Sequence, residues 1–183
     1  MKRIIAWLLT LLLLLGVMGG ASAAKMVQPF ENEYFKIYIP GDWIIDLSSV
    51  TDYWGALDLG FTYSPDLTML IETMLYFYAD WAEDSLWLAS SETWDEYLTF
   101  ILDDLKEESP ELLATIHAGQ YPGVLLKGVN EYGAYLYGEF LINAYAYGFR
   151  FYLLNEDDTV NSNLTEEEVE LFQSILETFT LNY

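Results

Sequence analysis

The sequence predicts an α+β fold in which an antiparallel sheet of about six or seven strands is packed by two or three helices. Two observations indicate this class. Apolar residues recur with a period of two in several short segments, and at spacings of three and four in two longer ones. Four strand-like segments between residues 112 and 154 also follow one another through links that are too short to join anything except antiparallel neighbours.

The first segment is typical of a signal peptide for export. Lys2 and Arg3 precede an apolar run over residues 4–18, and the small residues before Lys25 fit a cleavage site after Ala24. The alternative is a retained membrane anchor, but the run spans roughly 22 Å, less than the roughly 30 Å of a hydrocarbon core. We therefore expect a cleaved signal peptide over residues 1–24, a secreted or extracytoplasmic protein, and a single domain over residues 25–183.

Three strands are predicted in the first part of that domain. Residues 25–30 are expected to form a short frayed lead-in to the segment 34–39, which is rich in β-branched and aromatic residues and stops at Pro40. The segments 57–63 and 69–79 alternate apolar with other residues, so that each is expected to bury one face.

Two helices are predicted from their apolar stripes and their end signals. The first is expected to begin after an N-cap at Ser91 and to end at Ser109, before Pro110. A capping box of Thr165 and Glu168 predicts the start of the second helix. The stripe of the first helix contains Trp94, Tyr97, Leu98, Ile101, Leu102 and Leu105. The stripe of the second contains Val169, Phe172, Ile175, Leu176 and Phe179.

Between these helices, four consecutive strands are predicted over residues 112–118, 124–129, 134–142 and 147–154. Turn-forming residues join the first three, whereas the last link near residues 143–146 lacks glycine and leaves the register of the final pair open. Alternation places Leu136, Phe140 and Ile142 on one face of the sheet and Tyr135, Tyr137 and Leu141 on the other.

Composition excludes several classes of partner. The chain carries 29 acidic against 7 basic residues, a net charge of −22. Charge of this size keeps a protein soluble and repels phosphates, so nucleic acid and anionic membranes are not expected as partners, and a monomer is expected. Cations or a basic protein surface fit better. The chain has no cysteine, so thiolate nucleophiles and cysteine-bound metals are absent and the fold is held without disulfides.

The beginning of the domain resembles the PsbP-like superfamily, in which a strand runs into a proline followed by a buried tryptophan. The matching pieces are Phe30, the strand 34–39, Pro40 and Trp43, together with a closing helix at 172–179. Gly123, Gly133 and Gly148 match the turns of the family's meander. The resemblance implies an αβα sandwich around an antiparallel sheet, used mostly as a non-catalytic binding or accessory module in small exported bacterial proteins. No binding residue carries over from it.

Residues for catalysis are few. His117 is the single histidine, which is too little for a usual zinc site. A Ser-His-Asp triad would have to use it, but the sequence has no Gly-x-Ser-x-Gly nucleophile elbow. Glu72 and Glu139 are the acids most firmly inside predicted strands, and a carboxylate-dependent hydrolase would use such a pair. We expect instead that both lie on a half-exposed sheet face, with Glu139 paired to Arg150 or Lys127 across strands.

The candidate ligand-binding residues are the tyrosines Tyr135, Tyr137, Tyr145 and Tyr152 in the last two strands of the meander. If two or three helices leave one sheet face partly bare, these tyrosines form an aromatic platform for a sugar or a peptide; if both faces are covered, they are core. We favour partial exposure. No cofactor is predicted; Asp157 and Asp158 offer oxygen ligands for calcium, but the loop lacks the EF-hand glycine.

These observations predict an exported, non-catalytic binding or accessory protein that acts through protein–protein interaction. The first alternative is a carbohydrate-binding module with an exposed tyrosine-rich sheet face. The second alternative is the carboxylate-dependent hydrolase.

Overall fold

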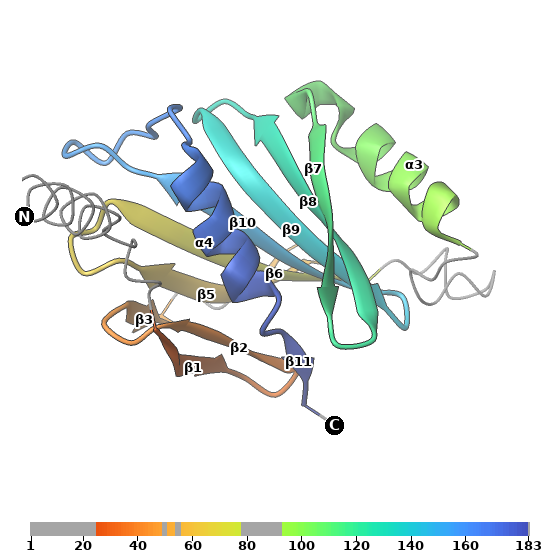
Figure 1. Cartoon of the computed structure of the whole chain (residues 1–183), viewed down its shortest axis with the longest axis horizontal. Coiled ribbons are helices and arrows are strands. Elements are labelled where there is room, and N and C mark those ends of the chain that lie inside the picture. Colours follow the sequence, from red (N-terminus) through yellow and green to blue (C-terminus); the bar gives the residue numbers. More distant parts are fainter. Residues whose placement is uncertain (1–24, 49–50, 54–55, 78–92, 183) are drawn as a thin grey trace, which may run out of the picture.

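The computed structural model describes residues 25–48, 51–53, 56–77 and 93–182. The predicted signal peptide and the predicted N-cap Ser91 lie outside the described residues. Within these ranges antiparallel strands predominate, and the helices α3 and α4 pack on them (Figure 1), so the α+β class is confirmed. No helix among the described residues is long and apolar enough to cross a membrane.

The larger sheet has eight strands in the order β3-β5-β6-β10-β9-β8-β7, with β4 paired to β5. Its strands are β3 (Ile44–Asp46), β4 (Thr51–Tyr53), β5 (Ala56–Tyr63), β6 (Met69–Phe77), β7 (Glu111–Ala118), β8 (Tyr121–Val129), β9 (Ala134–Ile142) and β10 (Tyr145–Leu153). The four predicted strands of the meander are therefore confirmed as β7 to β10, and β10 returns to pair with β6. This last pairing joins the two halves of the chain in one sheet.

A second, three-stranded sheet makes the prediction of a single sheet wrong. It has the order β1-β2-β11, with β1 (Met26–Glu31), β2 (Phe35–Pro40) and β11 (Thr180–Leu181). The expected frayed lead-in is strand β1, because Phe30 is buried in the core and residues 28–31 pair continuously with β2. An ion pair of 3.0 Å between Lys36 Nζ and Glu31 Oε2 joins the same two strands.

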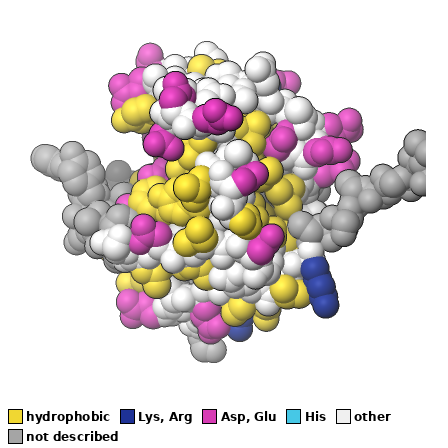
Figure 2. Space-filling model, turned by 90° about the vertical axis from the view of Figure 1, so that its left-hand side faces the viewer, with side chains coloured by type: hydrophobic (Ala, Val, Ile, Leu, Met, Phe, Trp, Pro, Cys, Tyr) yellow, Lys and Arg dark blue, Asp and Glu magenta, His cyan; other side chains and the backbone are white. Residues whose placement is uncertain are grey.

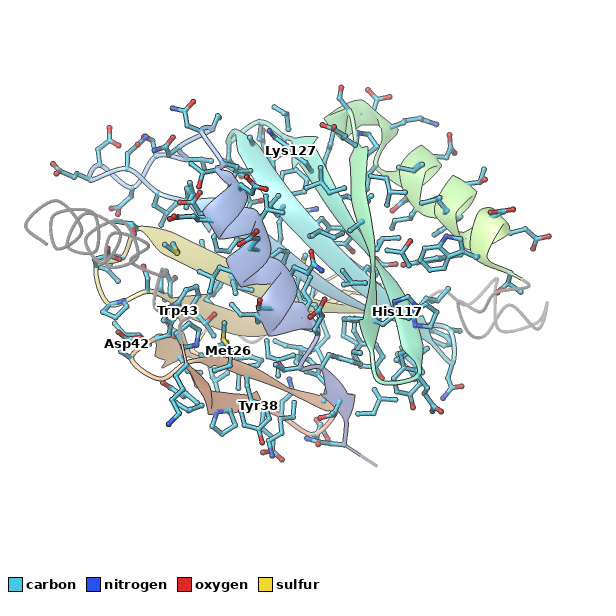
Figure 3. All side chains as sticks on the ribbon, in the orientation of Figure 1. Met26, Tyr38, Asp42, Trp43, His117 and Lys127 are labelled. Atoms are coloured by element: carbon cyan, nitrogen blue, oxygen red, sulfur yellow. The ribbon has the colours of Figure 1, made fainter. Side chains whose placement is uncertain are left out.

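Both faces of the larger sheet carry buried side chains. The small sheet and helix α4 (Glu166–Leu176) pack on one face, where Phe35, Phe149 and Phe179 lie in the same cluster. Helix α3 (Trp94–Asp104) packs on the other face, where Tyr97 and Ile101 meet Tyr135 and Tyr137. The predicted division of β9 into two faces is confirmed. Trp43, labelled in Figure 3, is 6% exposed and belongs to the cluster on the α4 side.

The helix ends show which local signals were sufficient. The capping box of Thr165 and Glu168 is present at the start of α4. The first predicted helix is present as α3, which follows Thr93, and it continues into a 3-10 turn, η1 (Lys106–Glu108). Ser109 ends it in a left-handed conformation, with a φ of 50°, immediately before Pro110.

Two of the glycines that were expected at turns lie inside strands instead. Gly123 belongs to β8 and Gly148 to β10, and only Gly133, with a φ of 142°, lies in a turn. An added Cβ at Gly148 would lie 2.8 Å from the hydroxyl of Tyr137, so this glycine makes room for a buried tyrosine on the neighbouring strand. The link between β9 and β10 is a two-residue turn in which Asn143 and Ala144 both adopt positive φ, the backbone conformation that matches the twist of a tight hairpin.

The surface is rich in acidic side chains, as the composition of the chain predicts. On the face drawn in Figure 2, hydrophobic side chains gather near the middle and Asp and Glu side chains surround them. Lys and Arg side chains are few on that face, in keeping with a net charge of −22. An apolar area with an acidic border is a surface that disfavours anionic partners.

Candidate functional site

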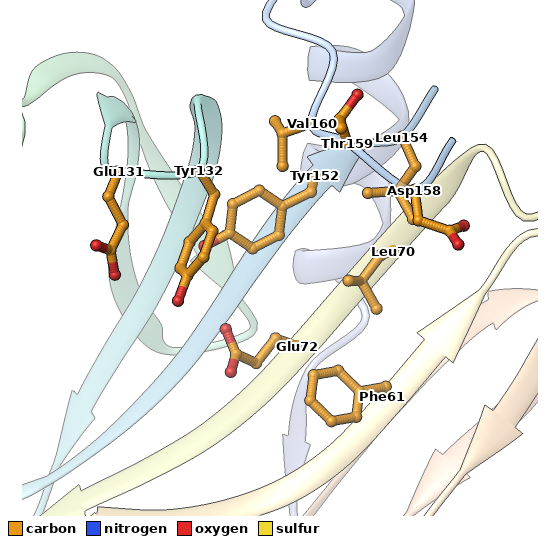
Figure 4. A pocket seen from close by; sticks show the side chains of 10 residues that line it. All are labelled: Phe61, Leu70, Glu72, Glu131, Tyr132, Tyr152, Leu154, Asp158, Thr159 and Val160. Carbon is orange, nitrogen blue, oxygen red and sulfur yellow. The ribbon is translucent and has the colours of Figure 1, made fainter. Parts of the chain in front are cut away.

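A groove of about 520 Å³ opens on the α3 side of the larger sheet, beyond the area that α3 covers. Its floor consists of Phe61 on β5, Leu70 and Glu72 on β6, and Tyr152 on β10. One wall is the turn between β8 and β9, with Glu131 and Tyr132, and the other is the chain after β10, with Leu154, Asp158, Thr159 and Val160 (Figure 4). A volume of this size is in the range of small-ligand sites.

Strand register sets the floor of the groove. Phe61 on β5 lies opposite Glu72 on β6, and Glu72 in turn lies opposite Arg150 on β10. Residues directly opposite each other in antiparallel strands point to the same face. A register shift between Asp58 and Gly60, where Gly60 has a φ of 110°, keeps Phe61 in this pairing. One apolar ring and one carboxylate are thereby placed side by side on the floor.

Asn130 holds the first wall. Its Oδ1 accepts hydrogen bonds from the backbone N–H groups of Tyr132 and Gly133, at 3.0 and 3.2 Å. Its Nδ2 donates to the hydroxyl of Tyr152 at 3.0 Å. The same side chain therefore shapes the turn that carries Tyr132 and fixes the ring of Tyr152 on the floor. Tyr132 is 68% exposed and Tyr152 is 7% exposed, so Tyr132 is the accessible aromatic group of the pair.

The second wall is tied to the first. The backbone N–H of Ala134 donates to Ser162 Oγ at 3.2 Å, and an added Cβ at Gly133 would lie 2.9 Å from Val160. An isolated bridge pairs Leu154 with Val160. The two walls therefore converge behind Tyr152 and close this end of the groove.

Glu72 is the ionisable group on the groove floor, and it is half-buried. Partial burial raises the pKa of its carboxyl, and the charge of Arg150 lowers it by a smaller amount. No hydrogen bond or ion pair joins its carboxylate to another residue within the described ranges. Figure 4 shows this carboxylate directed into the groove, between Phe61 and the hydroxyl ends of Tyr132 and Tyr152.

A second carboxylate lies on the same face, under α3. Glu139 is fully buried, and its Oε1 accepts a hydrogen bond of 3.0 Å from the hydroxyl of Tyr97 on α3. Its Oε2 accepts one from the hydroxyl of Tyr137, two residues earlier in β9. Burial raises the pKa of Glu139 to about 7 against these hydrogen bonds. The expected pairing of Glu139 with Arg150 or Lys127 is wrong, because the tyrosines take its oxygens and Lys127 alternates to the other face with Leu125.

Arg150 lies between the two carboxylates in the sheet. Its guanidinium is stacked over the rings of Tyr135 and Tyr137, at 4.9 and 5.7 Å from their centroids. Its Nη2 is 4.0 Å from Glu108 Oε2 in η1, and Glu108 also accepts a hydrogen bond from the hydroxyl of Tyr135. The guanidinium is therefore engaged toward α3 and η1, while its Nε has no hydrogen-bond partner among the described residues.

The expected partial exposure of the tyrosine row is wrong for three of its four members. Tyr135, Tyr137 and Tyr152 are 1%, 3% and 7% exposed, because α3, η1 and the turn at Asn130 cover the rings. Their hydroxyls are hydrogen-bonded to Glu108, Glu139 and Asn130, in that order. Tyr145 is more exposed, but it lies at the other end of β10 against Phe77, with a centroid separation of 5.0 Å. The four tyrosines therefore do not form one platform, and Tyr152 alone lines the groove.

The remaining candidates lie outside the groove, with the exception of Asp158. His117 is exposed on the edge strand β7 (Figure 3). The carboxylate of Asp157 accepts a hydrogen bond of 2.6 Å from Thr159 Oγ1 within its own loop, whereas Asp158 lines the groove. No three groups of metal-ligating type come together within the described ranges. The prediction of no cofactor and the alternative of calcium at Asp157 and Asp158 are both untested.

Sequence reasoning did not identify Phe61, Tyr132 or the chain after Leu154 as groove residues. Strict alternation would have placed Phe61 in the core with Leu57 and Leu59, but the register shift between Asp58 and Gly60 turns it to the face of Glu72. Tyr132 stood in a predicted turn, where an aromatic residue among Asn130, Glu131 and Gly133 has no core to enter. That position was the available sign of an exposed contact residue.

Comparison with known proteins identifies no family for this chain. No family model matches the chain, and no curated protein matches it. Among solved structures, a protein from Bacteroides thetaiotaomicron VPI-5482 is similar over 86% of this chain, with 16% identity and a TM-score of 0.46. The chain spans 49% of that protein's length.

Proposed function

We propose that the protein is an exported, non-catalytic binding protein and that the groove at Glu72 and Tyr132 holds its ligand. The observation that carries the proposal is an exposed tyrosine ring above a half-buried carboxylate that has no hydrogen-bond or ion-pair partner among the described residues, in a groove whose first wall is held by Asn130. A protein partner is preferred, because a groove open to the surface admits a polypeptide segment. Monomeric state and export remain part of the proposal.

The arrangement of carboxylates favours binding over hydrolysis. Glu72 lies in the groove, but Glu139 is fully buried beneath α3 with both oxygens bonded to tyrosines. A hydrolase of the usual type needs both carboxyl groups at the scissile bond. Glu72 and Glu139 lie in separate environments, and Glu139 is not exposed at the surface. This separation supports a binding role, in which the two acids do not have to act together.

The resemblance to the PsbP-like superfamily is part of the same proposal. It is supported by the burial of Phe30 and Trp43 and by the packing of Phe172 and Phe179 in the core. The implied αβα arrangement is supported by α4 on one face of the larger sheet and α3 on the other. The accessory role that the resemblance implies agrees with a groove that binds without reacting.

The proposal is tested by titrating the purified protein with short peptides and with cellobiose while its backbone amide resonances are observed. Ligand binding is expected to perturb the signals of Phe61, Tyr132 and Tyr152, and Tyr132→Ala should abolish the perturbation without loss of stability. Tyr145→Ala is the matched control, since Tyr145 is an exposed tyrosine at the far end of β10. Cellobiose binding in the groove would favour the carbohydrate alternative. Absence of any perturbation there would overturn the groove as the binding site.

A further inference from the structure

The groove carries an indication of the charge of its ligand, an inference that rests on its proposed role as the binding site. Glu72 is the relevant residue because its carboxylate is partly withdrawn from water and finds no partner within the described ranges. A carboxylate in such a position is stabilised by a cation that arrives from outside. Burial of the carboxyl raises its pKa, in the direction expected for a charge that lacks a partner.

Arg150 is the nearest candidate for an internal partner, since it lies opposite Glu72 across β6 and β10. Its guanidinium is instead stacked on Tyr135 and lies beside Glu108. Among the described residues, no ion pair within 4.0 Å joins it to Glu72. Arg150 reduces the local negative charge without occupying the groove, so the oxygens of Glu72 remain available to a ligand.

Aromatic rings surround the same carboxylate. Figure 4 shows Glu72 below the hydroxyl ends of Tyr132 and Tyr152, with Phe61 on the other side. The faces of aromatic rings attract cations, and ammonium groups are recognised in proteins by rings that line a pocket together with an acid. The combination of ring faces and one carboxylate is suited to an ammonium group on an apolar stem.

The remaining lining suits the stem and excludes an anion. Leu70, Leu154 and Val160 form an apolar strip along the groove, and methylene groups of a lysine side chain pack on surfaces of this kind. Glu131 and Asp158 border the groove, and no Lys or Arg of the described chain lines it. The chain as a whole carries a net charge of −22, so approach of a basic polypeptide is favoured at long range.

We propose that the groove binds a lysine side chain presented by a basic polypeptide segment, with the ammonium at Glu72 between the rings of Phe61, Tyr132 and Tyr152. The aliphatic stem of the lysine lies on Leu70 and Val160. The groove volume of about 520 Å³ exceeds one side chain, so neighbouring residues of the segment occupy the rest. Tyr132 forms the outer side of the site and is the group that a ligand contacts first.

The test uses a blocked five-residue peptide with one central lysine between glycines, and the same peptide acetylated at Nζ. Both are titrated into the purified protein at pH 7, at low salt and at physiological salt, with amide resonances as the readout. The lysine peptide is expected to perturb Phe61, Glu72 and Tyr152, and the acetylated form to bind roughly tenfold more weakly, because it loses a charge-assisted hydrogen bond.

The matched variants separate this site from general attraction to an acidic protein. Glu72→Gln should weaken the lysine peptide roughly tenfold. Glu170→Gln removes the same charge from an exposed position on α4, on the opposite face of the sheet, and should leave the affinity within about twofold. Equal losses in both variants, or equal binding of the acetylated peptide, would overturn the inference.

Failure of this inference is distinguishable from failure of the proposed function. If cellobiose or the acetylated peptide perturbs the groove and the lysine peptide does not, the groove is a binding site and its ligand is not cationic. If no probe perturbs Phe61 or Tyr132, the groove and the cationic ligand are both excluded.

Discussion

Tyr97 on α3 donates a hydrogen bond of 3.0 Å to Oε1 of Glu139, a fully buried carboxyl in the middle of β9. This bond joins the helix on one face of the larger sheet to a group whose pKa is raised by burial to about 7. The packing of α3 is thereby coupled to a titratable group inside the sheet.

The first prediction concerns the dependence of stability on pH. The native protein keeps the Glu139 proton up to about pH 7, whereas the unfolded chain releases it near the ordinary carboxyl pKa of 4.5. The native state therefore binds more protons between these values, and the free energy of unfolding should fall as pH rises through this window, by about 3 kcal/mol in total. Urea unfolding at a series of pH values measures it.

Glu139→Gln isolates this contribution, since glutamine has the same shape and does not titrate. The variant should match the parent near pH 4.5 and exceed it in stability above pH 7. A slope remains in the variant, because the pKa values of Glu72 and Asp104 are also raised by burial. If Glu139→Gln leaves the slope of the parent unchanged, Glu139 does not titrate in this window.

The second prediction concerns the hydroxyl of Tyr97. Tyr97→Phe removes a donor to the buried carboxylate, so it should lower the free energy of unfolding by about 1–3 kcal/mol above pH 7 and by less near pH 5, where Glu139 is neutral. Tyr121→Phe is the matched control, because the Tyr121 hydroxyl makes no hydrogen bond to a described residue. In the Glu139→Gln background the pH dependence of the Tyr97→Phe effect should disappear; its persistence there would argue against the coupling.

Much of the fold could be predicted from the sequence because its signals are local. The alternation in β9 identified both faces correctly, and Thr165 with Glu168 fixed the start of α4. The short strands could not be predicted in this way. Strand β11 has two residues and exists because Leu181 and Thr180 meet Phe35 and Lys36 of β2, a contact between the two ends of the domain that no local pattern encodes.

The site was less predictable, because exposure depends on where a helix ends. The alternation placed Tyr135 and Tyr137 on the second face of the sheet. It did not show that α3 and η1 cover the two rings, or that Glu108 and Glu139 accept hydrogen bonds from their hydroxyls. The uncovered part of that face lies over β5 and β6 instead. Tyr132 lines the groove from a turn, and a hydrogen bond from its backbone N–H to Asn130 shapes that turn.

The third prediction tests why glycines occupy strand interiors. Gly128 on β8 lies opposite Tyr135 on β9, and an added Cβ would be 2.5 Å from the Tyr135 ring. Gly128→Ala should therefore lower the free energy of unfolding by about 1–3 kcal/mol, since the buried ring has little room to move. The same substitution in a Tyr135→Leu background should cost less. An equal cost in both backgrounds would show that the ring is not what the glycine accommodates.

The last prediction concerns the first wall of the groove. Asn130→Ala removes the acceptor for the backbone N–H groups of Tyr132 and Gly133 and the donor to the Tyr152 hydroxyl. It should lower the free energy of unfolding by about 1–2 kcal/mol and weaken binding of the lysine peptide, because Tyr132 loses its fixed position over the floor. Asn155→Ala is the control, since its exposed side chain donates only to Thr159 within the opposite loop. Isothermal titration calorimetry measures both variants, and weakening by Asn155→Ala as large as by Asn130→Ala would mean that the Asn130 bonds do not position the ligand contact.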